Sequence, residues 1–314
     1  MSTPPTQRQP QPGPGAPPER VDPARLVGRI ASGDSAARRL LRVASRTLTS
    51  NGASRELAEL VIAAQRPVTT GRRIAVTSVR GGAGKSTVAA LLASVYAARR
   101  PDAVLATDAD PDGGSLTWRL GVSGRGTLAT LAARLLAARS GDLRGLEHLL
   151  PRTETGLWVL PGGAPGQPRL ARDVTRALSR LFAVCVTDCG RGMDSPATVQ
   201  VLSEAHAVVV VAPATPDGVR TTHDALGQVA GSAQAASLSR VIVALSRLNS
   251  EGRTALRGAA AREAFAHFDI PVVMLPYDRH LAAAATITPS RIGEAVLVEA
   301  TRLAGYALAR ARDL

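Results

Sequence analysis

The sequence predicts an α/β fold in which a mostly parallel, twisted sheet carries helices on both faces. Short apolar, β-branched segments recur along the chain from residue 73 onward, and longer amphipathic segments separate them. Strands that are apolar throughout are typical of parallel sheets, because helices bury both faces. A glycine-rich loop at 80–87 also joins the first such strand to the first such helix.

The elements follow one another in regular alternation, each strand being bounded by turn residues or by an acidic residue. The predicted strands are 73–79, 103–107, 157–160, 183–187, 207–212, 241–245 and 272–275. The main predicted helices are 85–99, 169–182, 218–236, 253–268 and 289–310.

Two segments precede this alternating pattern. Residues 1–23 are rich in proline, so we expect a disordered tail there. Residues 24–70 are predicted to form short helices, and residues 71–314 the main domain. Within the helical segment, 36–48 gathers arginines on one side and apolar residues on the other. Such a helix packs on the domain or lies on an anionic surface.

The composition limits which classes of partner and which cellular compartment the protein can have. The chain has 314 residues and a net charge of +13, which allows nucleic acid, an anionic membrane or an acidic protein as partner. No apolar run approaches the ~20 residues that span a bilayer, and the N-terminus lacks the apolar core of a signal peptide. We therefore expect a cytoplasmic protein, with peripheral association at a membrane or nucleoid left open. The two cysteines, Cys185 and Cys189, have no metal-site spacing and are expected to fill the core.

The glycine-rich loop has the context of a phosphate-binding loop, directly after a strand and at the start of a helix. Lys85 is the only lysine among many arginines, and a compact ammonium suits a site between phosphates. We expect Lys85 to bridge the β- and γ-phosphates, Ser86 to ligate Mg²⁺ and Thr87 to contact the α-phosphate. The residues predicted to bind the nucleotide are Gly81, Gly82, Ala83, Gly84, Lys85, Ser86 and Thr87.

Carboxylates follow two of the predicted strands. Asp108 and Asp110 follow the second strand, and Asp188 ends the fourth. The carboxyl ends of parallel strands face the ligand crevice of such sheets. One carboxylate of the first pair is expected to orient the attacking water and the other to support the metal. Asp188 has the position of a residue that holds a Mg²⁺-bound water.

These motifs together resemble the ParA/MinD family of deviant Walker ATPases over most of the chain, roughly residues 73–310. The family's KGGxGK(S/T)T loop matches 80–87, DxDPQ matches 108–111, and DxPxG matches 188–192 with glycine in place of proline. The resemblance implies a P-loop NTPase fold, the cofactors ATP and Mg²⁺, and an ATP-dependent homodimer. It assigns catalysis to Lys85 and Asp110, with Asp110 positioning the hydrolytic water, and the metal to Ser86, Asp108 and Asp188.

The sequence departs from the family pattern at residues expected to take part in catalysis and in binding the adenine base. The signature lysine, which reaches across the dimer to the partner's phosphates, is Arg80 here, and we assign Arg80 to the catalytic set on that resemblance. The family contacts adenine through an Asn-Arg or similar pair after a later strand, where this chain has Ser246-Arg247 without the asparagine. Arg247, Pro276 and Asp278 are the residues that the resemblance places beside the base.

Three segments, 66–76, 187–190 and 276–281, look like those of actinobacterial MinD-like ATPases. Some of these proteins accompany type VII (ESX) secretion and carry proline-rich tails. The function that this implies is an ATP-driven dimer switch with slow ATPase activity, in secretion or subcellular positioning, with a secretion-system or positioning protein as partner. Two alternatives remain open: a partition-type ATPase bound to DNA or to an anionic membrane, and a nucleotide-bound scaffold without turnover.

Overall fold

The structure is a computed structural model. It describes residues 27–28, 30–34, 51–110, 114–123, 126–137, 143–163, 167–190, 192–250 and 256–312. The chain divides into two units, residues 1–30 and 31–314, and all the elements below belong to the second. The tail expected at 1–23 and the basic helix expected at 36–48 lie outside the described residues.

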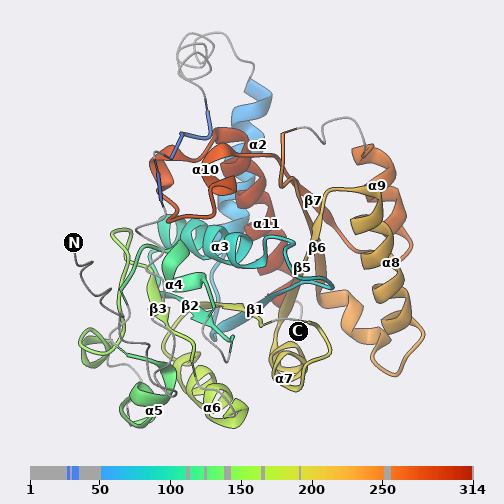
Figure 1. Ribbon diagram of the computed structural model, residues 1–314. Coiled ribbons are helices and arrows are strands. Elements are labelled where there is room, and N and C mark those ends of the chain that lie inside the picture. Colours follow the sequence, from blue (N-terminus) through green and yellow to red (C-terminus); the bar gives the residue numbers. More distant parts are fainter. Residues whose placement is uncertain are drawn as a thin grey trace, which may run out of the picture. The chain divides into compact units, whose positions relative to one another are not determined.

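A seven-stranded, all-parallel sheet forms the centre of the larger unit (Figure 1). Its order is β3-β2-β4-β1-β5-β6-β7, so the strand before the glycine-rich loop lies in the middle of the sheet. The strands are β1 (Arg72–Thr77), β2 (Val104–Asp108), β3 (Trp158–Leu160), β4 (Val184–Asp188), β5 (Ala207–Pro213), β6 (Val241–Ser246) and β7 (Val272–Leu275).

Helices fill the connections between the strands. The α-helices are α2 (Asn51–Gln65), α3 (Lys85–Arg99), α4 (Leu116–Arg119), α5 (Leu128–Leu136), α6 (Pro168–Leu178), α7 (Pro196–Glu204), α8 (Pro216–Ala230), α9 (Gly258–Ala266), α10 (Arg279–Ala282) and α11 (Glu294–Arg312). The 3₁₀ helices are η2 (Arg144–Leu146), η3 (Ala235–Arg240) and η5 (Pro289–Arg291).

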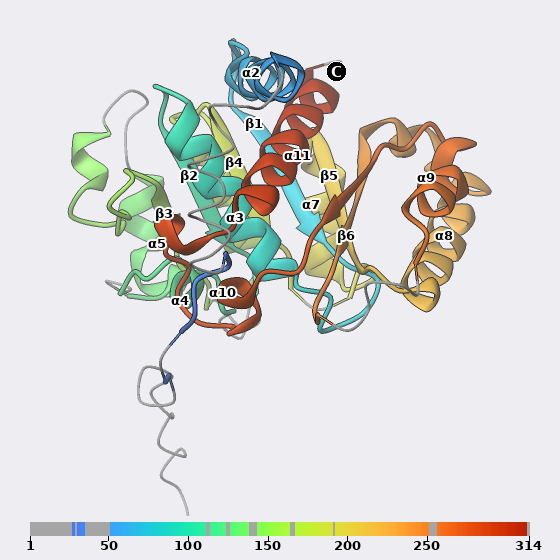
Figure 2. The same ribbon diagram turned by 90° about the horizontal axis from the view of Figure 1, so that it is seen from above.

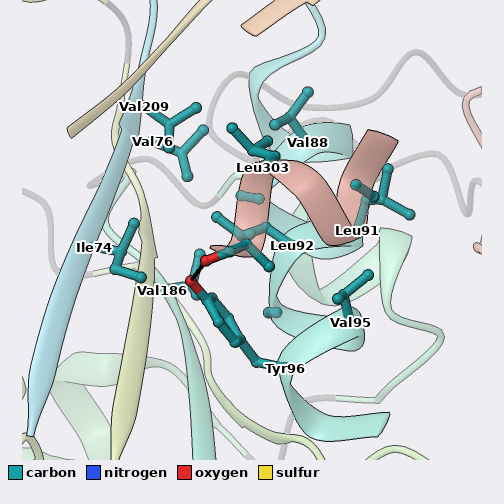
Figure 3. Packing of buried hydrophobic residues seen from close by; sticks show 14 of the residues in the cluster. Ile74, Val76, Val88, Leu91, Leu92, Val95, Tyr96, Val186, Val209 and Leu303 are labelled. Atoms are coloured by element: carbon teal, nitrogen blue, oxygen red, sulfur yellow. Dashed lines mark hydrogen bonds between the residues drawn. The ribbon is translucent and has the colours of Figure 1, made fainter. Parts of the chain in front are cut away.

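One face of the sheet packs against α3 and α11, with α2 lying against α11 (Figure 2). Figure 3 shows Ile74 and Val76 of β1 facing the apolar side chains of α3. Tyr96 on α3 is fully buried there, and its hydroxyl donates a hydrogen bond of 2.6 Å to the carbonyl of Ala304 on α11. This contact satisfies the buried hydroxyl and fixes the distance between the two helices.

The opposite face carries two separate apolar clusters. Helices α5 and α6 cover β2 and β3 around Trp158 and Phe182, whose rings meet edge to face at 5.9 Å. Helices α8 and α9 cover β5 to β7 around Phe265. The sheet is therefore covered by helices on both faces, as the apolar strands predicted.

Helix α2 is an integral part of this packing. Ala63 on α2 lies so close to Gly305 on α11 that a Cβ at Gly305 would come within 3.1 Å of the Ala63 Cβ. Arg302 on α11 pairs with Glu56 on α2 at 2.7 Å, and Arg100 after α3 donates to the carbonyl of Ala64 at 3.0 Å. Among the described residues, no helix has the length and hydrophobicity needed to cross a bilayer.

Some predicted boundaries were wrong. The strand predicted at 73–79 ends at Thr77, because the chain turns there into the glycine-rich loop. The helix predicted at 218–236 ends at Ala230, and 289–310 divides into η5 and α11. Helix α11 begins only at Glu294, whose N–H donates to the Asp34 carboxylate at 3.1 Å. This cap comes from a distant part of the chain, so local sequence does not reveal it.

Candidate functional site

The glycine-rich loop folds as a tight curl between β1 and α3. Gly82 and Gly84 adopt φ of 78° and 90°, in the left-handed region that favours glycine. The Ser78 hydroxyl donates to the Arg80 carbonyl at 2.9 Å and holds the entrance of the loop. Successive backbone N–H groups in such a curl form a concave donor surface for an anion.

The start of α3 adds to this donor surface. Its N-cap residue, Gly84, has no side chain to accept from the first-turn N–H groups. Those N–H groups and the helix dipole therefore favour an external anion. The side chains of Lys85, Ser86 and Thr87 on this turn are half-buried. The loop thus has the backbone geometry that the sequence predicted for phosphate binding.

Two carboxylates meet beside this turn. Asp108 and Asp188 are the last residues of the adjacent strands β2 and β4, and they are register partners. They are 1% and 3% exposed, and the N–H of Ala109 donates to the Asp188 carbonyl at 2.9 Å. The Ser86 hydroxyl hydrogen-bonds to the Asp188 carboxylate, and the Lys85 ammonium lies near enough to act on its charge. The strand register therefore places the two predicted metal carboxylates side by side, and Asp188 connects them to the glycine-rich loop.

Asp108 also organises the segment that follows β2. Its Oδ1 accepts from the N–H of Asp110 at 3.0 Å, and the N–H of Leu116 hydrogen-bonds to the same carboxylate. A Cβ on Gly114 would come within 2.6 Å of Oδ1, so only glycine fits at this position. Asp110 itself is half-buried beside Asp108. Residues 111–113, which include part of the DxDPQ-like motif, lie outside the described residues.

Burial and mutual repulsion alter the acidity of this pair. Burial, and after it the neighbouring charge of Asp188, raise the pKa of Asp108 to about 7. Burial raises the pKa of Asp188 to about 6, although the Ser86 hydrogen bond and the Lys85 ammonium oppose that rise. Without a bound cation, the folded chain therefore favours protonated carboxyls at this site.

The unfolding free energy of the nucleotide-free protein should consequently fall as pH rises from about 4 to about 7. Both carboxyls bind protons more tightly in the folded chain than in the unfolded chain, so deprotonation disfavours folding. Asp108→Asn cannot ionise at this position, so it should make the free energy of unfolding depend less on pH, with the contribution of Asp188 remaining. At pH 8 it should stabilise the protein by on the order of 2 kcal/mol. Denaturant unfolding in EDTA at several pH values measures the effect.

The matched control is Asp173→Asn, which removes an exposed carboxylate from α6. It should retain the wild-type pH dependence. An Asp108→Asn protein with a wild-type slope between pH 4 and pH 7 would show that this carboxyl is not the group responsible.

The site fits Mg²⁺ held jointly by protein and phosphate groups. Among the described residues, no cluster of three or more His, Cys, Asp or Glu side chains forms a preassembled metal site. Asp188 Oδ1, however, is buried and has no hydrogen-bond partner among the residues that the structure describes, so this carboxylate can accept from a metal-bound water. Mg²⁺ commonly binds through one or two carboxylates together with substrate phosphates. Ser86, Asp188 and Asp108 are the side chains that would hold it.

The loop after β6 approaches the glycine-rich loop. A Cβ on Gly84 would lie 3.4 Å from Leu248 and 3.6 Å from the Ser246 hydroxyl, and Leu248 is 45% exposed. The N–H of Arg247 donates to the Leu275 carbonyl at 3.0 Å, which brings Arg247 beside Pro276. Two of the three residues expected beside the base are therefore neighbours at one edge of the site.

Asp278, the third, is directed elsewhere and is only 3% exposed. Its Oδ1 accepts from the N–H of His280 at 2.7 Å, and its Oδ2 accepts from Gly293 at 2.7 Å. Both oxygens are thus occupied in joining α10 to the start of α11, and we withdraw Asp278 from the base-binding set.

Two residues of the β6 loop escaped the sequence analysis. Leu248 presents an exposed apolar side chain next to Gly84. Asn249 stands two positions after Arg247 in the same loop. The only sequence signal for it is an amide within the loop rather than directly before the arginine.

Arg80 projects away from the carboxylates. Its Nη1 pairs with Asp217 Oδ2 at 2.5 Å, and both side chains are 56% exposed. Asp217 lies in the first turn of α8 and also pairs with Arg220 at 3.0 Å. The residue expected to reach across a dimer is therefore held, in this single chain, by an exposed ion pair.

A second arginine, which the sequence analysis did not single out, interacts with the charge of Asp188. Arg119, the last residue of α4, has buried Nε and Nη1 atoms that no described part of the chain accepts from. Burial lowers the pKa of Arg119, and the attraction of Asp188 opposes that shift. Two cations, Lys85 and Arg119, thus act on Asp188.

Comparison with known families supports a nucleotide site. The family described as the CobQ/CobB/MinD/ParA nucleotide binding domain matches residues 74–287. The ESX-1 secretion-associated protein EspI of Mycobacterium tuberculosis is 32% identical over 229 residues, which cover 69% of this chain and 33% of EspI. The chain thus spans only about a third of the length of that relative.

Solved structures share the fold. The cell division ATPase MinD of Pyrococcus furiosus has a TM-score of 0.56 and 22% identity, over 74% of this chain and 97% of that one. The septum site-determining protein MinD of Pyrococcus horikoshii, solved with Mg-ADP, has a TM-score of 0.53 and 21% identity, over 76% and 94%. At these identities the likeness concerns the fold.

Proposed function

Because this chain belongs to the CobQ/CobB/MinD/ParA nucleotide-binding family, we propose that it binds ATP with Mg²⁺ and acts as an ATP-dependent dimer switch. The observation that carries the proposal is the joint position of the loop and the carboxylates. The Lys85 ammonium and the Ser86 hydroxyl of the glycine-rich loop both act on Asp188, at the carboxyl end of the sheet.

Each group has a distinct part in binding. The backbone N–H groups from Gly81 to Thr87 bind the phosphate oxygens, and Lys85 lies between the β- and γ-phosphates. Ser86 would hold Mg²⁺ through its hydroxyl, and the Asp188 and Asp108 carboxylates would support it from the ends of β4 and β2. Bound Mg²⁺ neutralises phosphate charge and so lowers the barrier to phosphoryl transfer.

The base lies toward the loop after β6 in this proposal. Leu248 supplies an apolar surface next to Gly84, and Arg247 and Pro276 border it. An amide can donate to a ring nitrogen and accept from an exocyclic amine, so Asn249 suits recognition of adenine.

Hydrolysis is the slower part of the proposed cycle. Asp110 lies two residues after the end of β2, and its N–H donates to the Asp108 carboxylate. In this proposal, Asp110 orients the attacking water. Arg80 contributes only after its pair with Asp217 opens and its guanidinium reaches the partner's phosphates. An exposed ion pair contributes at most about 1 kcal/mol. The interaction of Arg80 with ATP in a dimer can therefore exceed the free energy of its pair with Asp217.

The partner of the switch is proposed from the EspI similarity. EspI is named as an ESX-1 secretion-associated protein, and it matches this chain over 229 residues. We propose that this chain serves type VII secretion by exposing a protein-binding surface in its ATP-bound dimer.

Titration calorimetry with ATP, ADP and GTP, each with and without Mg²⁺, tests the binding. We expect ATP with Mg²⁺ to bind more tightly than GTP. ATP at 100 times its dissociation constant should raise the free energy of unfolding by about 2.7 kcal/mol, which thermal unfolding detects. Equal affinity for all three nucleotides, or none, would contradict the proposal. Phosphate release distinguishes a switch from a scaffold, because only the switch turns over.

A further inference from the structure

Arg119 is held in place by its own backbone. The Arg119 carbonyl accepts from the N–H of Ile287 at 2.7 Å, and the Trp118 carbonyl accepts from the Thr286 hydroxyl at 3.1 Å. The Trp118 indole donates to the Ala284 carbonyl at 3.3 Å. The segment 284–287 therefore anchors α4, so the Arg119 side chain starts from a fixed point beside α3 and β2.

The guanidinium that extends from this point lacks partners for two of its donors. Nε and Nη1 of Arg119 are buried and make no hydrogen bond within the part of the chain that the structure describes. An arginine remains charged under all physiological conditions and has five N–H donors in a planar fork. Buried donors of this kind are costly unless another state of the molecule gives them an acceptor.

The helix that carries Arg119 starts beside the carboxylate pair. A Cβ on Gly114, two residues before α4, would come within 2.6 Å of Asp108 Oδ1, and Asp108 is the register partner of Asp188. Asp188 Oδ1 is likewise buried with no partner in the described ranges, while the Ser86 hydroxyl hydrogen-bonds to the same carboxylate. The charge of Asp188 opposes the fall in pKa that burial causes at Arg119, so the two groups interact over a distance longer than a hydrogen bond. The orphan donors and the orphan acceptor thus carry opposite charges and complementary hydrogen-bonding capacity.

We propose that Arg119 is a positioning residue for Asp188, whose guanidinium binds and orients that carboxylate when Ser86 turns its hydroxyl to Mg²⁺. This inference rests on the proposed binding of ATP with Mg²⁺ and adds to it a residue outside the recognised motifs. A planar fork can hold both position and direction of a carboxylate, whereas a lysine supplies only the charge.

The test compares ATP affinity with excess Mg²⁺ and with EDTA, using a fluorescent ATP analogue. Arg119→Met should reduce the gain in affinity due to Mg²⁺ about tenfold, the effect of one charge-assisted hydrogen bond, and leave the affinity in EDTA within about twofold of wild type. Arg119→Lys should restore part of that gain. Arg134→Met removes an exposed arginine from α5 and should behave as wild type.

Thermal unfolding without nucleotide shows whether each variant is folded. A folded Arg119→Met protein with the wild-type gain from Mg²⁺ would overturn the proposal, and so would an equal loss of affinity with Mg²⁺ and with EDTA. A wild-type protein that binds no ATP would instead refute the proposed function, and with it this inference. The two failures are therefore distinguishable.

Discussion

Replacement of Lys85 by alanine is expected to abolish the stabilisation that ATP with Mg²⁺ confers on the wild-type protein. The ammonium is the one side-chain cation of the glycine-rich loop that also acts on Asp188. Its loss removes charge-assisted hydrogen bonds to two phosphates, which should weaken ATP binding about a hundredfold. Calorimetry measures the affinity, and thermal unfolding without nucleotide reports whether the variant is folded.

Lys85→Arg is the more discriminating variant, because this chain has arginine and no lysine at its other permanently cationic positions. A planar guanidinium does not fit where a compact ammonium lies between phosphates, so we expect Lys85→Arg to bind ATP almost as weakly as Lys85→Ala. Arg134→Ala, on the exposed side of α5, should leave binding unchanged. If Lys85→Arg bound ATP as tightly as wild type, any cation would suffice and the assignment of Lys85 would be wrong.

The second large effect is expected from Asp110→Ala, which should bind ATP with Mg²⁺ but release phosphate about 10²- to 10³-fold more slowly. Asp110 is proposed to orient the attacking water, whereas the loop N–H groups and Lys85 bind the phosphates. Because the cycle resets by hydrolysis, ATP should hold this variant as a dimer. Phosphate release and sedimentation velocity, each with ATP and with ADP, measure the two consequences.

Asp110→Asn keeps the size of the side chain and should show the same loss, while Asp173→Ala on α6 should turn over as wild type. Wild-type turnover by Asp110→Ala would remove Asp110 from the catalytic set. A wild type that binds ATP without releasing phosphate would favour the nucleotide-bound scaffold. A protein that stays monomeric with ATP, in wild type and variant alike, would refute the dimer switch.

The sequence by itself determined the alternation of strands and helices and the loop between β1 and α3. These features depend on local patterns: apolar runs specify buried strands, and glycines with left-handed φ are needed at Gly82 and Gly84. The same patterns placed Asp108 and Asp188 at strand ends, because a polar residue ends an apolar strand where the sheet edge meets solvent or ligand.

Only the tertiary structure decided which of these ends are neighbours. The register of β2 against β4 pairs Asp108 with Asp188, and the close packing of the β6 loop brings Leu248 to Gly84. The fold also buried Asp278 under α11 and placed Arg119 near Asp188. Such contacts join residues far apart along the chain, so they depend on strand order and helix packing. A local sequence pattern specifies only one of the two residues in each contact.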